Sequence, residues 1–178
     1  MDLIKAARRG REDAFLQLFA EHHLPLFRFA YRLTGSVADA EDIVQECFLE
    51  LLRPQCGYDP RRASVRSYLF GFIRNKSMKR LREKHFGAKG DLVATNNSSP
   101  EGELLRTELD NVVAHAVIQL PETQREVLIL AHYEQMQLAE IARALALDLR
   151  AAKSRLQRAR ASLKETLAEY MPSLERKK

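Results

Sequence analysis

Hydrophobic residues recur at three- and four-residue steps along most of the chain, and the alternation typical of β-strands is nearly absent. This pattern indicates an all-α protein. In the first half of the chain it predicts helices over four segments: Glu12–His23, Pro25–Leu33, Val37–Leu52 and Val65–Lys84. Gly35 would end the second helix, and Ser36 with Asp39 three residues later would cap the third. Ser64 would cap the fourth.

The segment 86–102, FGAKGDLVATNNSSPEG, has a different composition. It is rich in Gly, Ser, Asn and Thr and carries no helical stripe, so we expect a flexible linker. Beyond it the pattern predicts further helices: Glu103–Gln119, one beginning at Pro121, Leu138–Leu145 and Leu149–Tyr170. The sequence therefore predicts two small helical domains, residues 1–85 and 103–178, joined by the linker.

Bulk properties narrow the class of protein. Hydrophobic residues make up 46% of the 178 residues, enough for a buried core. The longest apolar run, Val127–Ala131, is too short to span a bilayer, and the N-terminus lacks the apolar region of a signal peptide. Cys47 and Cys56 belong to no CxxC or zinc-type spacing. We therefore expect a cytoplasmic protein with no membrane insertion, no metal and no other cofactor; Cys47 should lie in the core and Cys56 in an accessible loop.

The net charge of +5 is unevenly distributed. The segment 37–52 holds five acidic residues and no basic one, whereas 74–84 holds six basic residues and one acidic, and 149–164 holds six basic and none acidic. Two basic helices in different domains suggest two contacts with a polyanion, and the acidic helix suggests a basic partner. Three solvated helix faces would give the same charges, and charge alone does not separate the two interpretations.

The stretch LAEIARALALDLRAAKSRLQRAR has the layout of a helix-turn-helix. A turn at 146–148 would separate two helices, and Ala146 stands where such turns often carry Gly. The residues expected in the core are Ile141, Ala142 and Leu145 on the first helix and Leu149, Ala152, Leu156 and Ala159 on the second. The residues expected to face outward are Arg150, Lys153, Ser154, Arg155, Gln157 and Arg158. Such a helix fits the major groove of DNA, where Arg and Lys reach guanine edges and phosphates.

Longer stretches resemble a known family. LPETQREVLILAHYEQMQLAEIARALALDLRAAKSRLQRARASLKE resembles the C-terminal domain of extracytoplasmic-function sigma factors. LTGSVADAEDIVQECFLELL, followed by SVRSYLFGFIRNKSMKRLRE, resembles their N-terminal domain, and the two occur in the family's order. The resemblance implies a protein without catalytic activity that binds core RNA polymerase, directs it to particular promoters and helps to melt the DNA. It also implies control by an anti-sigma factor.

The resemblance assigns roles to three sets of residues. The residues implied to dock on the clamp helices of the polymerase β′ subunit are Asp39, Asp42, Gln45 and Glu46. Those implied to read and melt the −10 element are Phe70, Arg74, Asn75, Lys76 and Lys79, with the loop 53–63 beside them, while Leu69 and Phe72 are expected in the core. Those implied to contact the −35 element are the six outward-facing residues of the last helix. Tyr68 replaces the usual Trp of the family, and Arg150 replaces a small residue.

Two other hypotheses remain open at this point. A stand-alone helix-turn-helix regulator would explain the last two helices but not the acidic helix or the linker. An enzyme could use Asp39, Asp42 and Glu46, at positions i, i+3 and i+7, to hold a divalent cation. The chain supplies no further acidic or His ligands in a recognisable pattern, no phosphate-binding loop, and neither HExxH nor GxSxG.

Overall fold

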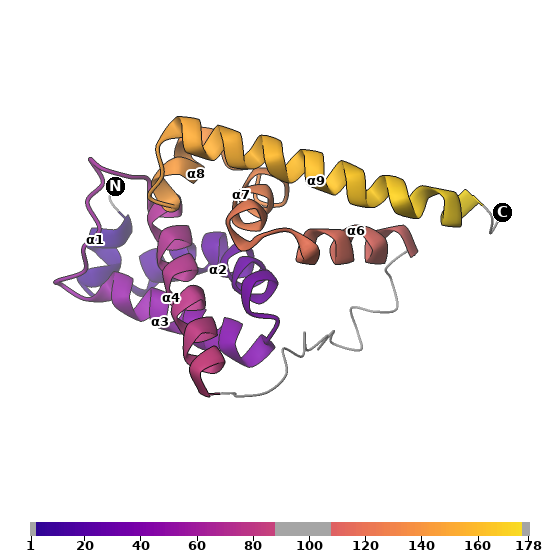
Figure 1. Cartoon of the computed structure of the whole chain (residues 1–178). Coiled ribbons are helices and arrows are strands. Elements are labelled where there is room, and N and C mark those ends of the chain that lie inside the picture. Colours follow the sequence, from indigo (N-terminus) through magenta and orange to yellow (C-terminus); the bar gives the residue numbers. More distant parts are fainter. Residues whose placement is uncertain (1–2, 88–107, 176–178) are drawn as a thin grey trace. The chain divides into compact units, whose positions relative to one another are not determined.

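The computed structural model describes residues 3–87 and 108–175, and the described residues contain helices joined by turns and no strand (Figure 1). The all-α prediction is confirmed. The helices group into two compact units. The first holds α1 to α4, and the second holds α6, α7, α9 and α8 up to Ala142. Most of the predicted linker lies outside the described residues, and its first two residues, Phe86 and Gly87, belong to the end of α4.

The first unit is a bundle in which α2 lies at the centre. The helices are α1 (Leu3–Arg8), α2 (Glu12–Thr34), α3 (Val37–Leu52) and α4 (Val65–Gly87). α2 packs against α1, α3 and α4, and α3 also packs against α4. The side chains that fill the core include Leu26, Phe29, Ile43, Leu51, Leu69 and Ile73, each at most 1% exposed. The contact of α3 with α4 brings the acidic helix beside a basic one.

One expected helix boundary is wrong. We predicted separate helices before and after Pro25, but α2 continues through it. A proline inside a helix removes one backbone hydrogen bond and usually kinks or ends the helix. Here the buried stripe runs across the proline from Leu18 through Leu26 to Leu33, so packing on both sides outweighs the lost bond. The pattern also did not predict the short helix α1.

Local capping signals, by contrast, were correctly identified. Gly35 ends α2 in the left-handed conformation (φ 68°), and its N–H donates to the Tyr31 carbonyl at 2.8 Å. The Ser36 hydroxyl accepts from the Asp39 N–H at 3.2 Å, and α3 spans the predicted 37–52. At the start of α4, the Ser64 hydroxyl accepts from the Ser67 N–H, also at 3.2 Å. These helix ends depend on residues within a few positions of one another.

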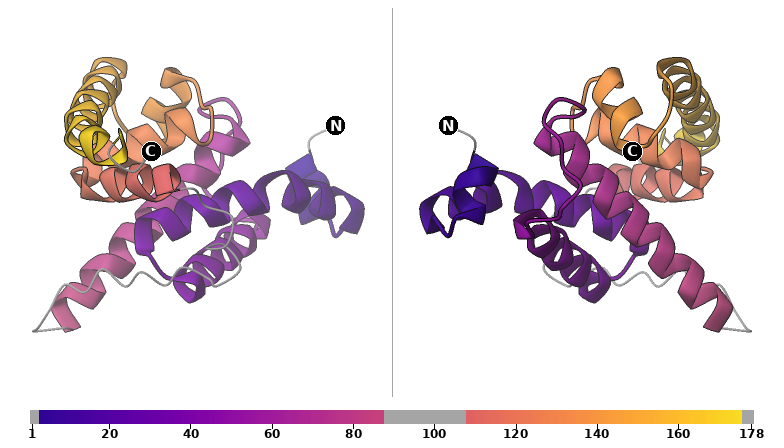
Figure 2. Two further views of the ribbon diagram at one scale, coloured as in Figure 1. Left: turned by 90° about the vertical axis from the view of Figure 1, so that its right-hand side faces the viewer. Right: turned by 90° about the vertical axis from the view of Figure 1, so that its left-hand side faces the viewer.

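The second unit is organised along its last helix. It contains α6 (Glu108–Gln119), α7 (Glu122–His132) and α9 (Leu149–Glu175), together with α8 (Leu138–Ala144) up to Ala142. Figure 2 looks almost along α9 and shows α6 and α7 beside it, in agreement with their packing. Val127, Ile129, Leu130 and Ile141 are completely buried. α9 extends five residues beyond its predicted end at Tyr170.

Both cysteines are buried, although only Cys47 was expected to be. Cys47 is 1% exposed, as predicted. Cys56 was expected to be accessible, but only 8% of it is exposed. Arg8, which donates a hydrogen bond to Cys56 Sγ, helps to cover it. Within the described residues, none of the helices combines the length and the apolarity needed to cross a bilayer.

Candidate nucleic-acid and partner interfaces

The acidic helix α3 presents carboxylates in two different environments. Asp42 and Gln45 are exposed and Glu46 is half-buried, whereas Asp39 is only 7% exposed. Arg80, on α4, lies beside this group: one guanidinium nitrogen, Nη1, is 3.5 Å from Asp39 Oδ1 and 3.9 Å from Asp42 Oδ2. The other, Nη2, is 3.8 Å from Glu46 Oε1. The face that could have held a divalent cation therefore already has a guanidinium against it.

A second cation of α4 reaches the same face. Lys76 Nζ lies 2.7 Å from Glu46 Oε2, and the side chains of the two residues are 41% and 43% exposed. The opposite charges of α3 and α4 therefore partly neutralise each other within the first unit. Because both groups remain in contact with water, the pair contributes roughly 0–1 kcal/mol to folding. Such a pair can exchange for contacts with a partner at little cost.

Two aromatic side chains of α4 lie in the opposite environments from those expected. Phe70, which we assigned to the −10 element, is 1% exposed and packs edge-on against Phe29, with ring centroids 5.3 Å apart. Phe72, which we expected in the core, is half-buried, and Lys76 Nζ lies 5.5 Å from its ring centre. Positions two apart on a helix point about 200° apart, so only one of the two rings can face the core. Of these two rings, the accessible one is thus Phe72.

The polar residues assigned to the same site lie where a ligand can reach them. Asn75 and Lys79 are exposed, and Arg74 and Lys76 are half-buried. Phe72, Asn75, Lys76 and Lys79 are three or four residues apart, so they share one face of α4. Leu69 is completely buried, as expected. α4 therefore presents an aromatic ring, an amide and cations together.

The helix-turn-helix forms where the sequence predicted it. Ala146 adopts a left-handed conformation (φ 52°), and the Leu147 N–H donates to the Ala142 carbonyl at 2.8 Å across the turn. Asp148 then caps α9, because its Oδ1 accepts from the Ala151 N–H at 2.7 Å. The turn has the backbone geometry that usually calls for Gly, with Ala in its place.

Most of the expected orientation of α9 is confirmed. Ala152, Leu156 and Ala159 are at most 5% exposed. Among the six residues assigned to the −35 element, Arg155 is half-buried, and the exposed ones are Arg150, Lys153, Ser154, Gln157 and Arg158. Leu149 was expected in the core but is 55% exposed. It is the first residue of α9, directly after the capping Asp148, and lies before the stripe that packs.

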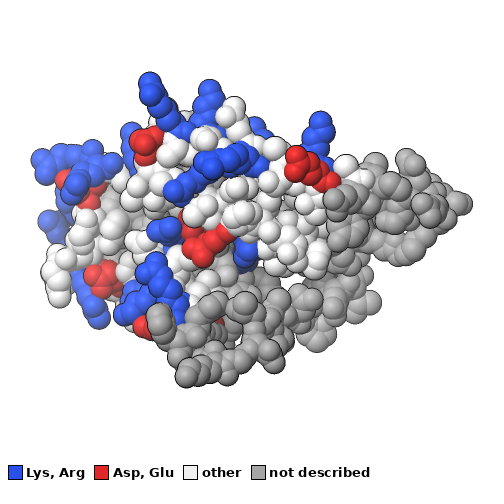
Figure 3. All heavy atoms as spheres, in the orientation of Figure 1, with Lys and Arg blue, Asp and Glu red and all other residues white. Residues whose placement is uncertain are grey.

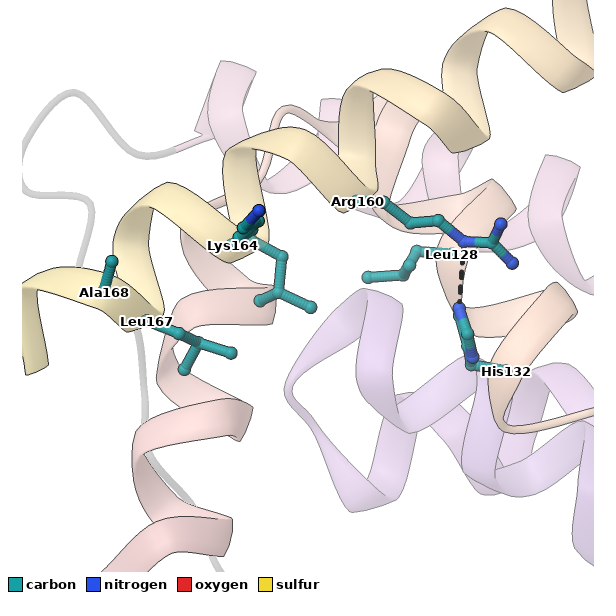
Figure 4. Close-up of a pocket in the computed structure, with 7 residues that line it drawn as sticks. Leu128, His132, Arg160, Lys164, Leu167 and Ala168 are labelled. Atoms are coloured by element: carbon teal, nitrogen blue, oxygen red, sulfur yellow. Dashed lines mark hydrogen bonds between the residues drawn. The ribbon is translucent and has the colours of Figure 1, made fainter. Parts of the chain in front are cut away.

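An apolar groove between α7 and α9 was not foreseen from the sequence. It has a volume of about 420 Å³ and is lined by Leu128, His132, Arg160, Leu163, Lys164, Leu167 and Ala168 (Figure 4). Its floor is aliphatic, and its rim carries Arg160 and Lys164. Arg160 Nε donates to His132 Nε2 at 3.3 Å, which places the proton of a neutral His132 on Nδ1. The four-residue spacing of Leu163 and Leu167 is the feature of the sequence that could have predicted an apolar stripe here.

Cations also mark the outer surface of the second unit. In Figure 3, Lys and Arg side chains gather along the upper edge, over α9. Of the described cations of that helix, Arg160 and Lys164 line the groove, whereas the six residues assigned to DNA are not part of its lining. α9 therefore serves two surfaces, one cationic and exposed, the other apolar. Within the described residues, no cluster of three His, Cys, Asp or Glu side chains could hold a metal ion.

Comparison with known proteins agrees with both units. The model of the family Sigma-70 region 2 matches residues 18–86, and that of Sigma-70, region 4 matches residues 111–163. The ECF RNA polymerase sigma factor SigL of Mycobacterium tuberculosis is 34% identical over 175 residues, which cover 95% of this chain and 97% of the relative. The similarity thus extends through both units.

Two solved structures have a similar fold. CnrH, solved in complex with the cytosolic domain of CnrY, gives a TM-score of 0.69 at 27% identity, covering 94% of this chain and 96% of that one. The sigma factor RpoE of Bartonella quintana, in complex with the anti-sigma factor NepR, gives a TM-score of 0.68 at 24% identity. That match covers 86% of this chain and 96% of RpoE, and it shows likeness of fold.

Proposed function

The chain belongs to the extracytoplasmic-function group of RNA polymerase sigma factors, and we propose that its two units divide promoter recognition between them. A protein of this group binds core RNA polymerase and directs it to specific promoters. It is an initiation factor, and we assign it no catalytic step of its own. Its place of action is the cytoplasm, where polymerase and chromosome meet.

In the first unit, the exposed side of α3 is the polymerase contact. Asp42, Gln45 and Glu46 offer two carboxylates and an amide to the basic clamp helices of β′. Asp39 contributes from beneath, because it is nearly buried beside Arg80. Charge complementarity of this kind sets orientation and speeds association.

The neighbouring face of α4 takes the melted −10 strand. An extruded base loses stacking and pairing worth a few kcal/mol, and a pocket must replace both. Phe72 supplies an aromatic face, Asn75 an amide for a base edge, and Lys76 and Lys79 charges for the phosphates. Arg74 belongs to the same site. Phe70 is assigned to the core beneath this face.

In the second unit, α9 is the helix that enters the major groove at the −35 element. The observation that carries this assignment is the division of α9 into a buried stripe of Ala152, Leu156 and Ala159 and an exposed cationic face. Arg155 and Arg158 reach bases or phosphates there, while Lys153, Ser154 and Gln157 add hydrogen bonds. Arg150 lies at the start of the same face.

We further propose control by an anti-sigma factor. The groove between α7 and α9 suits one helix of such a protein. Its aliphatic floor would bury the apolar stripe of an amphipathic helix, and Arg160 and Lys164 on its rim would pair with acidic residues. CnrH, with a similar fold, is bound to the cytosolic domain of CnrY.

The decisive experiment is transcription in vitro with core polymerase across a genomic promoter library. A sigma factor should start transcription from a subset of promoters and should bind promoter duplex tightly only together with core enzyme. A stand-alone helix-turn-helix regulator would bind duplex DNA tightly by itself and would not associate with core. Failure of the purified chain to bind core enzyme in the absence of any inhibitor would refute the proposal.

A further inference from the structure

The loop 53–63 joins α3 to α4 and has one buried side chain. Most of its side chains are exposed, and Cys56 is the one residue of this loop that is buried. The contacts of Cys56 therefore help to fix where the first half of the loop lies.

The contact comes from α1. Arg8 Nη2 donates a hydrogen bond to Cys56 Sγ, and Arg8 Nε donates to the Leu51 carbonyl at 2.9 Å. One guanidinium thus connects the last turn of α3 with the loop that follows it. The Cys56 N–H also donates to the Arg53 carbonyl at 3.1 Å, which tightens the first part of the loop.

The loop also contacts the first turn of α4. Burial, followed by the nearby Cys56, raises the pKa of Tyr68 to about 12. The ring of Tyr58, in the loop, packs edge-on against the ring of Tyr68 with centroids 5.3 Å apart. Tyr68 lies in the first turn of α4, the helix that carries Phe72 and Asn75. The loop is therefore tied to α1 through Arg8 and Cys56, and to the start of α4 through the rings of Tyr58 and Tyr68.

We propose that Arg8 is a positioning residue for −10 recognition: by holding Cys56, it sets where the loop presents its exposed side chains beside α4. Gln55 and Arg62 are exposed on this loop. An amide pairs with adenine and a guanidinium with guanine or phosphate, so their placement affects which base is accepted. This inference rests on the proposed function, because it requires that α4 bind the −10 strand.

The test measures base discrimination by holoenzyme assembled from full-length chain and core polymerase. Transcription is compared between a promoter that the wild type recognises and versions of it with single substitutions in the −10 element. Arg8→Met should lower the discrimination between cognate and substituted bases at one or more positions by about fivefold, the order of one base contact. The matched control is Arg9→Met, which removes the same charge from the exposed neighbour and should leave discrimination unchanged.

Variants at Cys56 test the same contact from the loop. Cys56→Ser keeps an acceptor for Arg8 and should retain discrimination, whereas Cys56→Ala removes it and should behave like Arg8→Met. This pair decides the matter if Arg8→Met fails to fold. Wild-type discrimination in Arg8→Met or Cys56→Ala would overturn the proposal, as would an equal loss of transcription from every version of the promoter. If the wild type itself starts no transcription, the proposed function fails together with this inference.

Discussion

Lys76 Nζ lies 2.7 Å from Glu46 Oε2, so a cation assigned to promoter DNA is paired with a carboxylate assigned to the polymerase. The two surfaces of the first unit therefore share side chains. A basic partner that pairs with Glu46 leaves Lys76 available for phosphates. A phosphate that pairs with Lys76 likewise leaves Glu46 available for a basic partner. Because the coupling of two binding events is reciprocal, each partner should favour the other.

Lys76→Met should tighten binding to core polymerase slightly, by up to about fivefold, because Glu46 loses the nearer of its two internal cations within the described residues and keeps only Arg80. The same variant should weaken the complex with melted promoter. Lys79→Met is the matched control: Lys79 lies 3.8 Å from Glu83 of its own helix, and its side chain is 71% exposed. It should not tighten core binding. Titration of labelled protein with core enzyme measures both, and equal affinities of the two variants would contradict the role of the pair.

Asp42→Lys should weaken core binding by about tenfold or more, because a like charge then faces the basic clamp helices. Asp42 is exposed, so the helical content measured by circular dichroism should stay unchanged. Glu41→Lys introduces the same charge at an exposed position off the carboxylate stripe and should have a smaller effect. Unchanged affinity of Asp42→Lys would mean that the polymerase contact lies elsewhere.

Arg158→Ala should lower transcription from cognate promoters by weakening the contact with the −35 element. If Arg158 binds a phosphate, the salt dependence of holoenzyme–promoter binding should become shallower by about one unit. Arg155→Ala should act in the same direction. Arg160→Ala removes a charge from the same helix, but Arg160 faces His132 across the groove, so the salt dependence should not change. If both Arg155→Ala and Arg158→Ala support transcription at the wild-type level, the assignment of α9 to the −35 element is wrong.

Ala146→Gly should stabilise the turn between α8 and α9, and with it the folded protein. A side chain in the left-handed region costs roughly 1–2 kcal/mol, part of which is offset by the greater freedom of Gly in the unfolded chain. We expect a net gain of about 1 kcal/mol, seen as a rise of a few degrees in the thermal midpoint. Ala151→Gly, within α9, should instead lower the midpoint. A midpoint unchanged by Ala146→Gly would show that φ of 52° at Ala146 carries no strain.

Acid should destabilise the first unit through His22. Burial of this side chain, and to a lesser extent the charge of Arg66, lowers its pKa, against an opposing effect of Glu21. The unfolded chain therefore takes up a proton near pH 6.5, before the folded one does, so the contribution of His22 to stability is present above about pH 6.5 and is lost as the pH falls through the folded pKa. His22→Gln should flatten this part of the stability profile. Urea unfolding of both proteins at about pH 5.5 and 7.5 measures the effect; parallel profiles would contradict it.

The sequence by itself determined the features that depend on neighbouring residues. The start of α3 follows from Gly35, Ser36 and the acidic first turn, all within a few positions. The turn at Ala146 and the buried stripe of α9 follow from local spacing in the same way. The assignment to the family also needed no coordinates, because two separate motifs occur in the correct order.

Tertiary structure decided what depends on the placement of one helix against another. The pattern of α4 allows either Phe70 or Phe72 to face the core, and packing against Phe29 selects Phe70. α2 continues through Pro25 because buried residues lie on both sides of the proline and pack in the same unit. The pairing of Lys76 and Arg80 with α3, and the hold of Arg8 on Cys56, join residues 30 or more positions apart in the chain. Such contacts form only when separate helices meet, so no periodicity along the sequence could reveal them.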